Sequence, residues 1–162
     1  MRILLASFAL ATLSACGLSP MYAGGGSGAV AQSLAAIEVS PIEGRAGWLV
    51  RSALEERFAA AGSATPQYRI EVRLDDQLDG LAVLRNDTIS RERRTLRARY
   101  QLIDLATGDI VLDATDESDA GIDVVSSEYA VIAAEQTALE NLSQDLAQRI
   151  VTRVALALRN QR

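Results

Sequence analysis

The sequence predicts an α+β fold in which two amphipathic helices pack on one face of a four-stranded, mostly antiparallel sheet, in the order β-α-β-β-β-α. Three observations support this prediction: four segments alternate apolar and polar residues, two segments carry apolar residues at three- and four-residue intervals, and glycine or proline separates them. Helices with one apolar stripe each can bury both stripes against one sheet face. The other face is then left to solvent or a partner.

The N-terminal residues 1–15 have the layout of a lipoprotein signal peptide. Arg2 supplies a positive charge, residues 3–11 are apolar, and the sequence Leu-Ser-Ala-Cys at 13–16 resembles the lipobox of bacterial lipoproteins. The alternatives are an ordinary signal with a chance cysteine, or a membrane anchor, although a span needs about twenty apolar residues. We expect cleavage before Cys16 and acylation of its thiol, because two or more acyl chains anchor a protein stably.

The rest of the chain divides into a tether and one domain. Residues 16–33 contain a glycine-rich run and are expected to be flexible, and residues 34–162 are expected to form a single α+β domain. Cys16 is the only cysteine, so stability must come from packing without an intramolecular disulfide. After cleavage, 15 arginines stand against 21 acidic residues, and this acidic balance gives no general attraction to nucleic acid.

The first two elements of the domain are a strand and a helix. Apolar and polar residues alternate over residues 35–39 and stop at Pro41, which predicts a strand. Residues 46–61 carry one apolar stripe and are followed by Gly62, which predicts a helix that ends there. Trp48, in the first turn of that helix, is expected to be partly buried.

Three strands follow, at residues 67–75, 88–105 and 109–122. The last two are joined by the short segment 106–108, which is typical of a three-residue hairpin loop with glycine in the left-handed conformation. The apolar residues of the two strands then face one another. The expected register pairs Leu105 with Asp109, Leu102 with Leu112, and Tyr100 with Ala114.

The final element is a long helix at residues 127–159. Its apolar residues recur at three- and four-residue steps, as expected for one buried stripe. The stripe is clearest in the second half, where it comprises Leu139, Leu142, Leu146, Ile150, Val154, Ala157 and Leu158.

The composition excludes most catalytic machinery. The chain has no histidine, and all sixteen basic residues are arginine, so a Ser-His-Asp triad, a histidine-ligated zinc and a lysine Schiff base are impossible. A carboxylate pair for glycoside hydrolysis remains conceivable at Asp75, Asp76 and Asp79. That stretch is more simply a strand that runs into a solvated loop. We therefore expect no enzyme activity, no cofactor and no metal site.

Four arginines form the candidate binding site. Arg91, Arg93, Arg97 and Arg99 share odd numbering on one predicted strand, which places them on one face. Guanidinium groups about 7 Å apart suit phosphate or carboxylate oxygens. Alternatively, they form a charge ladder, because the predicted register puts Glu117 opposite Arg97 and Asp113 diagonal to Arg99. Arg69 and Arg73 extend the same face.

Taken in order, several segments make the chain similar to the LptE family of lipopolysaccharide-assembly lipoproteins. The segments are the Leu-Ser-Ala-Cys-Gly-Leu-Ser-Pro-Met-Tyr opening at 13–22, the Thr-Leu-Arg-Ala-Arg-Tyr-Gln-Leu stretch at 95–102, Thr-Gly at 107–108, and Ser-Glu-Tyr-Ala at 127–130. Leu18 and Met21 depart mildly from the family's Phe and Leu. Only the lipidated Cys16 transfers position by position.

This resemblance implies a non-catalytic plug and assembly factor for the outer-membrane β-barrel that delivers lipopolysaccharide to the cell surface. It also implies lipopolysaccharide binding through basic residues. Gly17, where an aspartate would signal retention at the inner membrane, favours a lipid anchor on the periplasmic face of the outer membrane. The alternative function is a periplasmic accessory lipoprotein of a phospholipid-transport ABC system.

Overall fold

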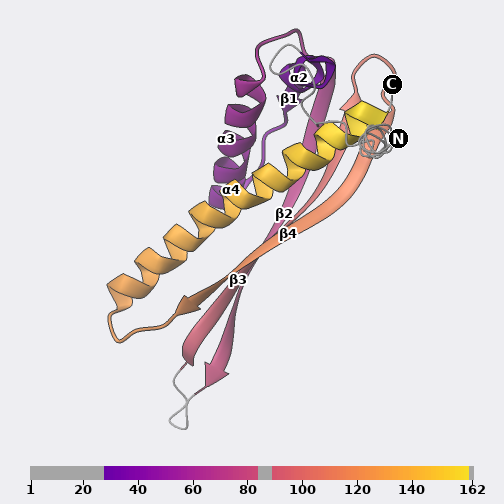
Figure 1. Ribbon diagram of the computed structural model, residues 1–162. Coiled ribbons are helices and arrows are strands. Elements are labelled where there is room, and N and C mark those ends of the chain that lie inside the picture. The colour runs from indigo at the N-terminus through magenta and orange to yellow at the C-terminus, as the bar shows by residue number, and fades with distance from the viewer. Residues whose placement is uncertain (1–27, 84–88, 161–162) are drawn as a thin grey trace, which may run out of the picture.

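The computed structural model describes residues 28–83 and 89–160. Within these residues the chain forms three helices and four strands, and the strands lie in the order β1-β2-β3-β4 (Figure 1). The elements are α2 (Ala29–Ala35), β1 (Ile37–Val39), α3 (Gly44–Ala60), β2 (Tyr68–Val83), β3 (Ile89–Asp104), β4 (Ile110–Asp123) and α4 (Glu128–Asn160).

The sheet is mixed, with one parallel and two antiparallel pairings. The short β1 runs parallel to the start of β2, whereas β2–β3 and β3–β4 are antiparallel. The far halves of β2 and β3 extend beyond β1 and α3, and α4 crosses the sheet diagonally (Figure 1). The predicted α+β class, the order of the predicted elements and the mostly antiparallel sheet are therefore confirmed.

One helix, α2, was not predicted. It begins at Ala29, inside the range 16–33 that the sequence assigned to the tether, and it replaces the first residue of the strand expected at 35–39. Ala31 and Leu34 lie three residues apart on the helix and are buried. Two apolar contacts are too few to produce a clear helical period in the sequence, although they are enough to hold one short helix on the domain.

The core lies between the sheet and the two longer helices. Even-numbered residues of β2 and β3 face the helices, as their alternation predicts. Those in the halves of the strands that the helices cover are buried, namely Ile70, Val72, Leu96, Ala98, Tyr100 and Leu102. The predicted stripe of α4 is buried against them. The largest side chains with almost no exposure are Tyr100, Leu54, Ile70, Leu96, Leu102, Leu146 and Ile150.

Strand β2 continues well past the predicted end at residue 75. Asp75, Asp76 and Asp79 therefore lie within a strand, and the solvated loop expected there was wrong. The reason is that β3 offers an arginine near each acid. Asp76 lies 2.6 Å from Arg94 in a largely buried ion pair, and Asp75 and Asp79 stand directly opposite two further arginines of β3. These cross-strand charges make the acidic segment compatible with a sheet.

The β3–β4 hairpin has the predicted register except next to its loop. Leu102 pairs with Leu112 and Tyr100 with Ala114, as expected. A register shift follows Leu102, and the backbone N–H of Asp104 donates to the carbonyl oxygen of Asp109. Leu105 therefore does not stand opposite Asp109. Gly108 has a φ of 78°, which confirms its left-handed conformation.

Trp48 is exposed rather than partly buried. Its exposed fraction is 65%. In this turn of α3 the buried residue is Gly47, so the side chain of the next residue, Trp48, lies toward solvent. A Cβ atom on Gly47 would lie only 2.6 Å from the carbonyl oxygen of Ile42. The first turn of α3 thus packs against backbone, and no room exists there for a large side chain.

Across residues 28–83 and 89–160, no helix has both the length and the apolar character needed to cross a membrane.

The core predicts a large stability loss for a truncation in α4. We expect Leu146→Ala, at a fully buried position, to reduce the free energy of unfolding by about 2–5 kcal/mol. The control is Tyr129→Ala, because Tyr129 on the same helix is exposed and its loss should change stability by less than about 0.5 kcal/mol. Denaturant unfolding followed by circular dichroism measures both. Similar losses in the two variants would contradict the described packing.

Candidate functional site

The four predicted arginines lie together on the sheet face that points away from the helices. Their side chains are exposed, whereas the even-numbered neighbours Leu96, Ala98 and Tyr100 are buried. The strand parity used to group the arginines therefore holds. The face is formed by the odd-numbered residues of β2, β3 and β4, and we call it the open face.

Each of these arginines has a carboxylate partner on β4. The N–O distances are 3.7 Å for Arg93–Asp119 and 3.0 Å for the other three pairs, which are Arg91–Asp123, Arg97–Glu117 and Arg99–Asp113. The predicted charge ladder is therefore present. All the partners are largely exposed, so water screens these pairs and they hold the arginines only loosely.

The β2 side of the open face distinguishes the arginines from one another. Arg93 faces Asp79 and Arg97 faces Asp75, so each stands between two acidic positions. Arg99 instead faces Arg73. A directly opposed pair of like charges is unfavourable in a sheet unless an anion or water separates the two groups.

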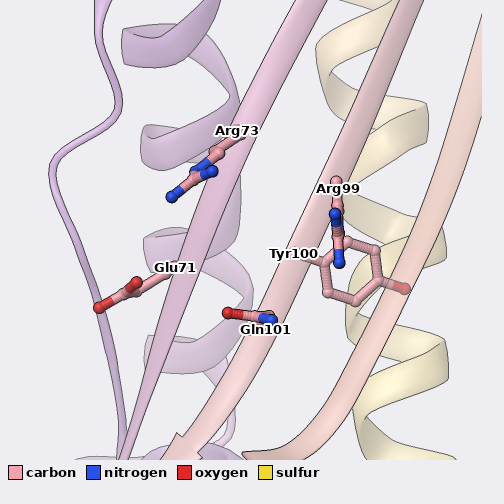
Figure 2. A pocket seen from close by; sticks show the side chains of 5 residues that line it. All are labelled: Glu71, Arg73, Arg99, Tyr100 and Gln101. Atoms are coloured by element: carbon pink, nitrogen blue, oxygen red, sulfur yellow. The ribbon is translucent and has the colours of Figure 1, made fainter.

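A pocket of about 160 Å³ opens beside this arginine pair. Arg73 and Arg99 project from opposite positions on β2 and β3, with the Arg73 guanidinium turned away from Arg99 and with Glu71 and Gln101 in the next row of the sheet (Figure 2). Within the described residues, Arg73 makes no salt bridge, whereas Arg69 on the same strand is paired with Glu38 at 2.6 Å. The pocket thus contains one free and one loosely held guanidinium group.

The Arg99–Asp113 pair secures the charges of both its members. Hydrogen bonds from Arg99 and then Gln101 lower the pKa of Asp113, so this carboxylate stays ionised. The same Asp113 hydrogen bond raises the pKa of Arg99. The pocket therefore offers two positive charges, from Arg73 and Arg99, with Asp113 bound to Arg99 and the carboxylate of Glu71 in the lining beside Arg73. This arrangement can bind phosphate or carboxylate oxygens in a bidentate manner.

The polar groups of the opposite face hold α4 on the sheet. The Tyr100 hydroxyl donates to Asp116 at 2.6 Å, and Asp116 also accepts from Arg153 at 2.7 Å. Burial, followed by the Asp116 hydrogen bond, raises the pKa of Tyr100. Ser118 donates to Asp145 of α4 at 2.6 Å. These hydrogen bonds connect β3 and β4 to each other and β4 to α4, so the groups that form them have a structural role.

Parity alone did not single out Arg73. The sequence placed Arg69 and Arg73 on the same face as the candidate arginines, but it could not show which residue of β2 meets which residue of β3. The useful signal is the β2–β3 register. Arg93 and Arg97 stand opposite acids of β2 and Arg91 stands opposite Ala82, whereas Arg99 stands opposite a second arginine. Cys16 lies outside the described residues.

The comparisons with known proteins identify the family. A model of the LptE family, described as lipopolysaccharide-assembly, matches residues 34–154. The chain belongs to the LptE family. This confirms the resemblance deduced from the sequence, places the chain in lipopolysaccharide assembly, and agrees with the expectation that it is not an enzyme. A search of curated proteins finds no significant match.

Solved structures share the fold at low sequence identity. A candidate lipoprotein from Caulobacter crescentus CB15 is 24% identical, with a TM-score of 0.63 over 80% of this chain and 95% of that one. A minor lipoprotein from Acinetobacter baumannii is 12% identical, with a TM-score of 0.61 over 74% and 90%. The rare lipoprotein B from Shewanella oneidensis is 12% identical, with a TM-score of 0.55 over 78% and 96%.

Proposed function

We propose that this LptE-family protein is an outer-membrane lipoprotein that acts as plug and assembly factor of the β-barrel delivering lipopolysaccharide to the cell surface. The observation that carries the proposal is the family match over residues 34–154, which covers most of the domain. The same match favours this function over an accessory role in phospholipid transport. The lack of histidine and lysine agrees with a protein that acts by binding.

The anchor in this proposal is an acylated Cys16 at the periplasmic face of the outer membrane. The support comes from the sequence, where the lipobox-like residues precede Cys16 and Gly17 follows it. We propose that the glycine-rich tether expected from the sequence, most of which lies outside the described residues, gives the domain reach, since about twelve residues of unstructured chain can span roughly 20 Å. The domain can then enter a barrel while its lipid stays in the leaflet.

The proposed lipopolysaccharide contact lies on the open face and is centred on Arg99. Of the predicted set Arg91, Arg93, Arg97 and Arg99, only Arg99 has a second arginine directly opposite it. Phosphate groups of a glycolipid would accept hydrogen bonds from both guanidinium groups and balance their two positive charges. Arg91, Arg93 and Arg97 then act mainly as members of the charge ladder.

Co-purification tests the proposed partner. The tagged full chain, solubilised with outer membranes in mild detergent, should recover one large β-barrel protein in stoichiometric amount. Cys16→Ser should release the chain into the soluble fraction and reduce this recovery, because the anchor no longer holds the domain at the membrane. Recovery of the wild-type lipoprotein alone, while other barrel complexes in the same extract stay intact, would contradict the proposal.

Paired substitutions test the lipid contact. Arg73→Gln with Arg99→Gln should weaken binding of purified lipopolysaccharide at least about tenfold, since two charge-assisted contacts are lost. The matched control is Arg91→Gln with Arg93→Gln, which removes the same charge from the same face and should change affinity much less. Equal losses in the two double variants would show that overall charge, and not the Arg73–Arg99 pair, determines binding.

A further inference from the structure

Strand β4 ends the sheet and leaves one edge unpaired over its length. It is the last strand in the order β1-β2-β3-β4 and has fourteen residues. Among the described residues, no backbone or side-chain group forms a hydrogen bond to the main chain on that edge. A long open edge is a template for strand addition, and proteins usually shorten, cover or charge such edges.

A shallow groove accompanies the far half of this edge. It lies between the end of β4 and the first half of α4, and small side chains dominate its wall. An added strand would send every second side chain toward α4, over this groove. Because the wall is made of small residues, the groove has space for apolar side chains of moderate size. The small residues of the wall are Ala120, Gly121, Ala133, Ala134 and Ala138.

The open-face side of the same edge is acidic. Glu117, Asp119 and Asp123 lie along β4, and their side chains are 56%, 60% and 74% exposed. Arg97 uses only the Oε2 atom of Glu117 for both of its hydrogen bonds, and Arg91 uses only Oδ1 of Asp123. The second oxygen of Glu117 and that of Asp123 therefore form no hydrogen bond within the described residues and can accept one from a basic side chain.

The acidic row and the groove together disfavour pairing of this edge with β4 of a second copy of the chain. A symmetric β4–β4 pairing would bring the two acidic rows together, and like charges directly opposite one another destabilise a sheet. A strand with basic residues on one face and apolar residues on the other fits both surfaces. Strand β3 has this alternation, with arginines on the open face and Leu96, Ala98 and Tyr100 on the inner face, and it already occupies the other edge of β4.

We propose that the open edge of β4, from Glu117 to Asp123, binds an extended segment of a partner protein by strand addition. The segment alternates arginine or lysine with apolar residues. Its basic side chains share the carboxylates of the acidic row, and its apolar side chains enter the groove beside Ala134. This interaction is separate from the lipid contact at Arg73 and Arg99, so its failure leaves the proposed function intact.

A peptide with the sequence of residues 93–103 serves as the probe, because it has the required alternation. The purified full chain should bind this fluorescent peptide, measured by anisotropy, and should not bind a peptide of the same composition with the alternation scrambled. Hydrogen exchange should slow at backbone amides of residues 117–123 in the complex. Equal binding of both peptides, or no binding up to about 1 mM, would overturn the proposal.

Two variants and one matched control locate the contact. Asp119→Lys should weaken peptide binding about three- to tenfold, because it reverses one charge in the acidic row. Ala134→Phe should weaken it by filling the groove. Asp79→Lys makes the same charge change on the β2 side of Arg93 and should leave affinity unchanged. An equal loss with Asp79→Lys would overturn the proposal, as would self-association of the chain that Asp119→Lys abolishes.

Discussion

The packing of α4 across the inner face of β3 and β4 is the constraint on which the rest of this structure depends. One apolar stripe, including Leu146, Ile150 and Val154, covers the inward residues of the sheet. In the part of the chain that the structure describes, α3 and α4 both lie on this side, and no helix covers the other face. Polar bonds from β4 to α4 complete this contact. The open face and the edge of β4 are consequently the surfaces on which sheet residues are available for binding.

This one-sided arrangement explains how much could be predicted from the sequence. Strict alternation in β3 and β4 and a three-residue loop with Gly108 determine both the inward residues and most of the hairpin register, so the charge ladder was predictable. The register shift after Leu102 could not be predicted, because it depends on the conformation of the loop together with the packing of both strands. Helix α2 and the exposure of Trp48 depend on tertiary contacts, which leave little trace in a local pattern.

The candidate site was only partly predictable for a related reason. The sequence predicted strands at residues 67–75 and 88–105 with no register between them, so the pairing of Arg73 with Arg99 emerges only from the folded sheet. Parity identified a face, and register identified a pair of residues on it. The pair is distinctive because Arg93 and Arg97 each have an acid opposite on β2 and an ion pair on β4, whereas Arg73 makes no salt bridge within the described residues.

The central proposal is that lipopolysaccharide binds on the open face, at Arg73 and Arg99, and not at the exposed arginines of the helices. An arginine-specific dicarbonyl reagent, with modification of each arginine measured by mass spectrometry on the full chain, tests it directly. In the presence of lipopolysaccharide, modification should slow at Arg73 and Arg99 and stay unchanged at the exposed helical residues Arg51 and Arg149. Protection of the helical arginines with unchanged reactivity at Arg73 and Arg99 would contradict the account.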